Sequence, residues 1–230
     1  MSGSIVSPEL RARVRGVATP IAVGFGRLGL TPNHLTLIGF GIAIVAAIAA
    51  GMQAWLAAGL LLILGGLFDL FDGALARATG RASKLGAFMD SVFDRAGEGV
   101  VYVGIVAGCL AADFDMGAIL AAAAMASAFM VSYVRAKSES LGFTPGSRMA
   151  AIGLAPREVR IVILTLGLLL TAILGGIALG DFDLVSQVSS WEMGIGGRPV
   201  LAIALGLITI FATITAIQRI VHVIRQTPQE

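Results

Sequence analysis

The sequence has few charged residues and almost no cysteine. Asp, Glu, Lys and Arg make up only 13% of its 230 residues, about half of their share in a typical soluble domain. Its one cysteine, Cys109, cannot form a disulfide within the chain, and no Cys/His cluster for zinc is present. The net charge of +2 is too small to attract nucleic acid. These shortages exclude a disulfide-rich scaffold, a zinc-binding domain and a nucleic-acid-binding domain.

Apolar residues are abundant instead, and they occur in long runs. They make up 57% of the chain, and the mean hydropathy is +0.92. A transmembrane helix needs about 20 predominantly apolar residues, and six runs are long enough: 35–52, 55–76, 88–112, 116–141, 157–179 and 200–224. The composition predicts an all-α membrane protein with six transmembrane helices, located as a multi-pass protein in the cell membrane.

The first 30 residues differ from the rest of the chain. Pro8–Arg27 alternates basic with apolar residues, which is typical of an amphipathic helix at the membrane surface, and Pro20 is a point where it can break. Thr31 is a candidate N-cap, with Pro32 at the first helical position. The chain is therefore divided into a cytoplasmic juxtamembrane segment (1–30), a six-helix membrane domain (31–226) and a tail (227–230).

Lysine and arginine are distributed unevenly among the predicted loops. If the N-terminus is cytoplasmic, Arg198 is the only one of the 16 basic residues in an outside loop. Basic residues accumulate on the cytoplasmic side of membrane proteins. The pattern places both termini in the cytoplasm, together with the polar segment between the second and third spans.

Four carboxylates flank that polar segment. Asp69 and Asp72 end the second span, and Asp90 and Asp94 begin the third. Spacings of three and four residues put each pair on one face of its helix. An antiparallel return through Gly80 would bring the pairs together, and four converging carboxylates need cations between them. Oxygen ligands at this density favour Mg²⁺, Mn²⁺ or Ca²⁺ over zinc, so the sequence predicts a metal site.

A four-carboxylate site suits phosphoryl chemistry, because two metal ions stabilise both the attacking and the leaving oxygen. Gly73 and Ala76 leave room for a ligand beside the helix, and Arg77 adds a cation. A divalent-cation transporter could use the same carboxylates. The outward halves of the second and third spans, 55–67 and 100–112, however, hold no charged residue for an ion path.

Several cations are predicted at the same height as the carboxylates: Arg135, Lys137, Arg157, Arg160 and Arg219. Arg157 and Arg160 share one face of the fifth span near its N-terminus, where anions are favoured. Arginine binds phosphate oxygens through its planar fork. These residues are candidates for holding a substrate phosphate, or for the simpler role of anchoring anionic lipid headgroups.

Two features of the third span have open interpretations. Glu98, one turn beyond Asp94, is a candidate for a buried carboxylate that supports the site through a hydrogen bond. Gly104 and Gly108 permit close helix packing, either within the chain or in a dimer.

The pattern around the carboxylates resembles the signature of the CDP-alcohol phosphatidyltransferase family. It reads Asp69-x2-Asp72-Gly73-x2-Ala76-Arg77-x8-Gly86-x3-Asp90-x3-Asp94, without departure at any motif position. The resemblance implies that a hydroxyl of an acceptor alcohol attacks the lipid-linked phosphate of CDP-diacylglycerol or a related CDP-lipid and releases CMP. It also implies a homodimer.

The same resemblance assigns roles to the motif residues. Two Mg²⁺ or Mn²⁺ ions per active site would be held by Asp69, Asp72, Asp90 and Asp94. Asp94 would also be the general base that takes the acceptor's proton. The CDP group would lie against Pro32, Asn33, Asp69, Asp72, Gly73, Ala76, Arg77 and Gly86.

Within the family, the basic residues resemble the phosphatidylinositol-phosphate synthase branch. In that branch the phosphate of inositol phosphate is held by residues that correspond to Arg135, Lys137, Arg157, Arg160 and Arg219, although the first two are swapped in order and Pro156 replaces an acidic residue. The expected acceptor is a phosphorylated polyol, first of all inositol phosphate, and the product phosphatidylinositol phosphate. The alternative is glycerol 3-phosphate, the acceptor of a phosphatidylglycerophosphate synthase.

Overall fold

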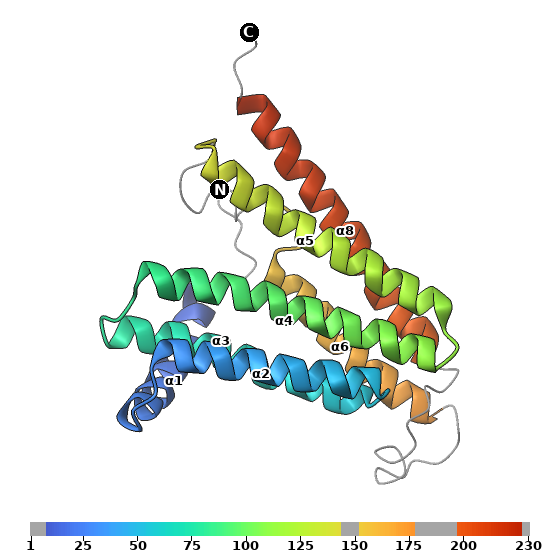
Figure 1. The fold of residues 1–230 in the computed structure, drawn as a ribbon, viewed down its shortest axis with the longest axis horizontal. Coiled ribbons are helices and arrows are strands. Elements are labelled where there is room, and N and C mark those ends of the chain that lie inside the picture. The colour runs from blue at the N-terminus through green and yellow to red at the C-terminus, as the bar shows by residue number, and fades with distance from the viewer. Residues whose placement is uncertain (1–7, 144–151, 178–196, 227–230) are drawn as a thin grey trace.

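The computed structural model describes residues 8–143, 152–177 and 197–226. Every regular element in these ranges is a helix: α1 (Pro8–Arg27), α2 (Pro32–Gly51), α3 (Trp55–Ala78), α4 (Lys84–Ala111), α5 (Asp115–Ser140), α6 (Arg157–Ile177) and α8 (Gly197–Gln226) (Figure 1). The predicted all-α class is confirmed for these ranges. The predicted tail, residues 1–7 of the juxtamembrane segment and the last two residues of the fifth predicted span lie outside them.

Five helices are long and apolar enough to cross a membrane: α2, α3, α5, α6 and α8. Helix α4 is not among them, because Asp94, Arg95 and Glu98 interrupt it and leave an uncharged stretch only from residue 99 to residue 111. The chain is therefore a multi-pass membrane protein by the length and composition of its helices. The sixth span, through α4, remains a prediction.

The first membrane helices form an antiparallel arrangement that returns where the sequence predicts. Helix α2 packs against both α3 and α4, and all three run nearly side by side in Figure 1. Gly80, just beyond the end of α3, has a φ of +65°, a conformation that glycine adopts without steric cost. The polar link through Gly80 thus brings the start of α4 back beside the end of α3.

Side-chain caps define where α2 and α4 begin. Thr31 accepts a hydrogen bond from the backbone N–H of His34, and the ring of His34 accepts one from the N–H of Thr31, at 3.3 Å each. This capping box, with Pro32 in the first turn, confirms the predicted start of α2. Ser83 caps α4 by accepting a 3.0 Å hydrogen bond from the N–H of Gly86.

Helix α1 continues through Pro20, contrary to the expectation that this residue could break it. A proline inside a helix costs about 3 kcal/mol, and packing against α3 offsets that cost. Ala18 and Ala22 are buried in a cluster with Leu75 of α3, and the ring of Phe25 lies 5.8–5.9 Å from two phenylalanine rings of α3. Tertiary contacts, rather than local propensity, keep this helix whole.

The glycines of α4 pack inside the chain. A Cβ atom at Gly104 would overlap the carbonyl oxygen of Ala47, and one at Gly108 would overlap that of Ala50. Both carbonyls belong to α2, so the two glycines let the backbones of α2 and α4 touch. The close packing predicted for these glycines therefore serves the chain's own bundle. Helices α5 and α8 pack on each other and complete it (Figure 1).

Candidate functional site

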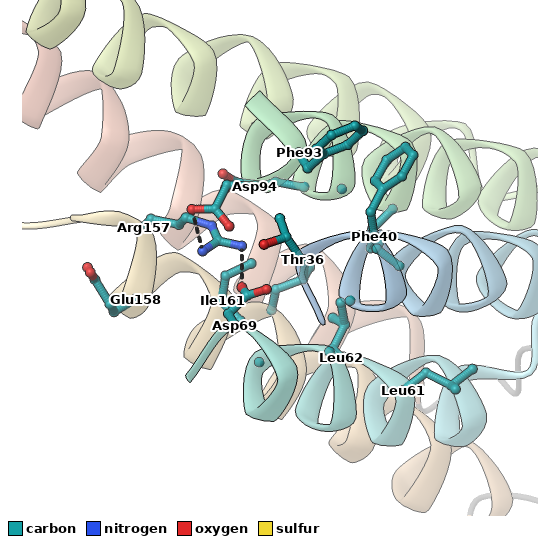
Figure 2. Close-up of a pocket in the computed structure, with 18 of the residues that line it drawn as sticks. Thr36, Phe40, Leu61, Leu62, Asp69, Phe93, Asp94, Arg157, Glu158 and Ile161 are labelled. Atoms are coloured by element: carbon teal, nitrogen blue, oxygen red, sulfur yellow. Dashed lines mark hydrogen bonds and ion pairs between the residues drawn. The ribbon is translucent and has the colours of Figure 1, made fainter. Parts of the chain in front are cut away.

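A cavity of about 460 Å³ lies between α2, α3, α4 and α6. Figure 2 shows Asp69, Asp94 and Arg157 together at one end of it, with Leu61 and Leu62 farther along α3. Other apolar side chains line the same space, among them Phe40, Ala43, Val101 and Leu164. The cavity therefore joins a charged end to an apolar interior.

The structure brings the four predicted carboxylates together. Asp72 interacts electrostatically with Asp69 and Asp90, and Asp94 interacts with the same two. Asp69 and Asp72 come from the end of α3, and Asp90 and Asp94 from the first part of α4. The antiparallel return at Gly80 produces this convergence, as the spacing predicts. Like charges this close repel one another, and a cation among them stabilises their charged form.

Arg157, the first residue of α6, supplies such a cation. Its Nη2 lies 3.0 Å from Oδ2 of Asp69, and its Nη1 lies 2.9 Å from Oδ2 of Asp94 (Figure 2). Arg95 lies farther away, with Nη1 3.4 Å from the same oxygen of Asp94. The planar guanidinium of Arg157 can bind two carboxylates at once because its donors point in fixed directions. The Nε of Arg157 is buried and has no hydrogen-bond partner among the described residues.

A threonine that the sequence analysis missed orients the most buried of the four carboxylates. Thr36 of α2 donates a 2.7 Å hydrogen bond from Oγ1 to Oδ2 of Asp72. Asp72 is 5% exposed. The only sign of this role in the sequence was that Thr36 is a polar residue one turn into an apolar span. Beside it, the rings of Phe40 and Phe93 lie 5.0 Å apart and join α2 to α4.

The chemistry of the donor set fits a hard divalent cation. All four side chains offer carboxylate oxygens, which Mg²⁺ and Mn²⁺ prefer. Within the described residues, however, no three such side chains are arranged as a ready coordination group. Asp69 and Asp94 are turned toward Arg157 instead. An ion that binds these two carboxylates through their Oδ2 atoms would therefore compete with Arg157 for them.

The predicted CDP-binding residues lie at the helix ends around the carboxylates. A Cβ atom on Gly86 would lie 3.3 Å from Oδ1 of Asn33, so the starts of α2 and α4 meet there. The guanidinium of Arg77 lies over Gly73, with Nη1 3.1 Å from the place of a Cβ atom. Larger residues would crowd both polar groups. Two further members of the set lie on the same helices, in the first turn of α2 and near the end of α3: Pro32 and Ala76.

The five predicted phosphate-binding cations are not gathered on one surface. Arg157 lines the cavity of the carboxylates. Arg135 lines a second cavity of about 520 Å³ between α4 and α5 and pairs with Glu139 at 2.9 Å. Lys137 is exposed on α5. Spacing along the chain placed all of them at one height, but it could not show which way each points.

Arg160 is buried and fully engaged, against the expectation that it faces a phosphate. It is 1% exposed, and its Nε and Nη2 each donate a 2.8 Å hydrogen bond to Glu98. Its Nη1 donates to the carbonyl oxygen of Ala155 at 3.0 Å. Glu98 is thus a buried carboxylate, as predicted, and its partner is Arg160.

Arg219 of α8 also points into the protein. It is 3% exposed and donates to the carbonyl oxygens of Ile152 at 3.0 Å and Val131 at 2.8 Å. In this arrangement Arg219 joins α5 to the segment before α6. Arg160, whose three nitrogens all donate, would have to leave its partners in order to bind a phosphate.

Comparison with known proteins is consistent with this geometry. The sequence model described as CDP-alcohol phosphatidyltransferase matches residues 29–224, which include the capped start of α2 and the whole carboxylate motif. The chain belongs to the CDP-alcohol phosphatidyltransferase family. It is therefore a transferase, which sets aside the cation-transporter alternative.

Its relatives include inositol-phosphate lipid synthases. An archaetidylinositol phosphate synthase of Pyrococcus horikoshii is 37% identical over 171 residues, which are 74% of this chain and 86% of the relative. A phosphatidylinositol phosphate synthase of Cutibacterium acnes is 33% identical over 221 residues, 94% of this chain and 97% of the relative. The predicted resemblance to this branch is confirmed.

Solved structures of a third relative share the fold. The crystal structure of Mycobacterium tuberculosis phosphatidylinositol phosphate synthase (PgsA1) with CDP-DAG bound matches with a TM-score of 0.72 at 25% identity, over 90% of this chain and 93% of that one. The same enzyme in complex with manganese and citrate matches with a TM-score of 0.71 at 26% identity, over 90% and 88%.

Proposed function

We propose that the protein transfers a phosphatidyl group from CDP-diacylglycerol, or a related CDP-lipid, to a phosphorylated polyol. Inositol phosphate is the first candidate for the acceptor, and the products are then phosphatidylinositol phosphate and CMP. One observation carries the proposal: the cavity has Asp69, Asp94 and Arg157 at one end and apolar side chains beyond them. This suits a substrate whose phosphates lie at the charged end and whose lipid part lies in the apolar part. The relatives' names support the choice of acceptor.

The metal-binding role of the aspartates is part of this proposal. Asp69, Asp72, Asp90 and Asp94 would hold two Mg²⁺ or Mn²⁺ ions, and the manganese in a related structure supports this. When bound, such ions counter the negative charge of the pyrophosphate and lower the pKa of the acceptor hydroxyl. Thr36 contributes by fixing the carboxylate of Asp72 before any ligand arrives.

Asp94 is the proposed general base. Its side chain is 12% exposed and lies at the charged end of the cavity, so it can take a proton in a space that is largely screened from bulk water. The acceptor oxygen then bonds to the phosphorus on the lipid side of the pyrophosphate. The bond from that phosphorus to the bridging oxygen breaks, and CMP leaves with the electron pair.

The two substrates are proposed to contact different residues around Asp94. Asn33, Gly73, Arg77 and Gly86, with Pro32 and Ala76, surround the proposed place of the CDP group. Arg157 is the proposed first contact of the acceptor phosphate, because it lines the cavity and its Nε lacks a partner among the described residues. Arg135 and Lys137 are proposed to contribute at longer range.

The membrane arrangement is likewise proposed. Helices α2–α6 and α8 would supply six spans, α1 would lie amphipathically at the cytoplasmic surface, and the site and both termini would face the cytoplasm. Arg198, the one predicted outside cation, donates a 2.7 Å hydrogen bond to the carbonyl oxygen of Ala112, at the end of α4 farthest from the aspartates. That position supports the orientation. The family resemblance supports a homodimer.

Release of CMP by the purified protein tests the function. The assay contains Mg²⁺, either CDP-diacylglycerol or its ether-linked archaeal counterpart, and inositol 1-phosphate, glycerol 3-phosphate, free inositol or serine. Turnover confined to inositol 1-phosphate supports the proposal. Turnover with glycerol 3-phosphate alone keeps the chemistry and replaces the acceptor. Absence of CMP with every acceptor, in protein that binds neither CDP-lipid, contradicts the proposed function.

A further inference from the structure

Two ion pairs connect α4 to α6, one helical turn apart. Asp94 and Glu98 are four residues apart on α4, and Arg157 and Arg160 are three apart on α6, so each pair of side chains lies on one helix face. Arg157 contacts Asp94, and Arg160 contacts Glu98. The first pair borders the cavity, whereas the second is closed off from solvent.

The Glu98–Arg160 pair is the more buried of the two. Each side chain is 1% exposed, and two parallel hydrogen bonds of 2.8 Å join them. By comparison, the side chains of Arg157 and Asp94 are 27% and 12% exposed. The fork of a guanidinium donates two parallel hydrogen bonds to a carboxylate in a defined geometry, so the buried pair favours one register between the helices.

A buried ion pair of this kind adds little net stability, because removing two charges from water cancels most of their attraction. Apolar side chains of similar volume would stabilise the same interior at least as well. The retained charges therefore need another explanation, and a defined register between α4 and α6 supplies one.

Arg160 also fixes the segment from which α6 begins. It donates to the carbonyl oxygen of Ala155, and Thr215 of α8 accepts hydrogen bonds of 3.0 Å from the N–H groups of Leu154 and Ala155. Arg157 follows two residues later. The backbone of Arg157 is thus fixed on its N-terminal side by the contacts of Leu154 and Ala155, and on its C-terminal side by the buried Arg160.

These contacts point to a role that no motif assigns. We propose that Glu98 and Arg160 are positioning residues: their buried pair sets the register of α4 against α6 and thereby holds Arg157 at the charged end of the cavity. Arg160 acts on the acceptor only through Arg157. The inference rests on the proposed function for its kinetic consequence, but the register itself can be measured without turnover.

Glu98→Gln separates this role from direct phosphate binding. A phosphate-binding Arg160 would be released by the loss of its partner, and the KM for inositol 1-phosphate would fall or stay unchanged. A positioning Arg160 loses its fixed orientation, Arg157 shifts, and that KM rises. We expect a rise of roughly tenfold to a hundredfold, the scale of a misplacement of about 1 Å at a reacting group, with the KM for the CDP-lipid changed less than about threefold.

Glu98→Gln leaves the buried charge of Arg160 without its partner, which favours misfolding. The double variant Glu98→Gln/Arg160→Gln therefore keeps the proposal testable if the single variant does not fold. Removing both charges together is tolerated far better than removing one. The double variant should fold and show the same raised acceptor KM. Matched controls are Asp113→Asn and Arg225→Gln, which alter exposed residues away from the pair and should leave both KM values unchanged. A double variant with the acceptor KM of the parent protein would overturn the proposal.

Spin labels measure the register directly. Val103 of α4 and Val162 of α6 are 57% and 56% exposed, and the only native cysteine is buried, so cysteines at these positions can be labelled selectively. We expect one narrow distance in the parent protein and a broader or shifted one in both Gln variants. An unchanged distance would refute the positioning role. This readout holds even if no acceptor supports turnover, an outcome that would count against the proposed function alone.

Discussion

The guanidinium of Arg157 lies against Asp94, with 2.9 Å between Nη1 and Oδ2. The same group contacts Asp69 at 3.0 Å, so one arginine from α6 bridges the two helices that carry the aspartate motif. The side chain that is proposed to meet the acceptor phosphate is therefore also a counter-ion of the proposed metal site.

Removal of this arginine should strengthen metal binding. Arg157→Gln removes the cation that competes for Asp69 and Asp94, so the Kd for Mn²⁺ should fall roughly fivefold or more, within the usual range of coupling between ligands. Mn²⁺ binding is measured by electron paramagnetic resonance on protein without substrate. Arg135→Gln, which breaks the pair with Glu139, is the matched control and should leave the Kd unchanged. Equal or weaker Mn²⁺ binding by Arg157→Gln would show that the two cations do not compete.

Asp94→Asn should abolish turnover and spare lipid binding. The amide keeps the shape of the side chain but cannot take a proton, so kcat should fall by about 10²–10⁴. Binding of the CDP-lipid, measured by displacement of a labelled analogue, should change little. Asp113→Asn serves as the control for a carboxylate at the far end of α4. Joint loss of turnover and lipid binding would assign Asp94 to the architecture of the site rather than to proton transfer.

Thr36→Val should weaken the site through Asp72. Valine has nearly the same shape but leaves the buried carboxylate without its 2.7 Å hydrogen bond, which should cost about 1–3 kcal/mol of unfolding free energy. The Mn²⁺ concentration needed for half-maximal CMP release should rise as well. Thr209→Val is the comparison, because among the described residues the hydroxyl of Thr209 bonds to the backbone of α8 at Leu205. Equal effects of both changes on the Mn²⁺ dependence would show that Thr36 does not act on the site through Asp72.

Gly104→Ala should destabilise the bundle. The added methyl group meets the carbonyl of Ala47 and forces α2 and α4 apart, at a cost of about 1–3 kcal/mol. Gly41→Ala on α2, where no atom lies within 4 Å of the new methyl group, should be neutral or stabilising because alanine favours helix. Thermal unfolding in detergent compares the two. A destabilisation as large at residue 41 as at residue 104 would refute the packing argument.

The sequence by itself determined the class of the protein, its helices and its motif. Apolar runs of spanning length leave the backbone no alternative to helix in lipid, and the spacing of the four aspartates, with the glycine return between them, places them together whatever the details of packing. Local signals also gave the start of α2, because the Thr31 cap and Pro32 act through their own turn.

Only the tertiary structure decided which cations face the cavity. Arg157 and Arg160 are equivalent by spacing and charge, yet one reaches Asp94 and Asp69 while the other is closed in against Glu98. The continuity of α1 through Pro20 and the hydrogen bond from Thr36 to Asp72 could not be predicted from the sequence for the same reason. Each depends on what lies across a gap between helices that are distant in sequence, and helical periodicity fixes the face of a residue but not its partner.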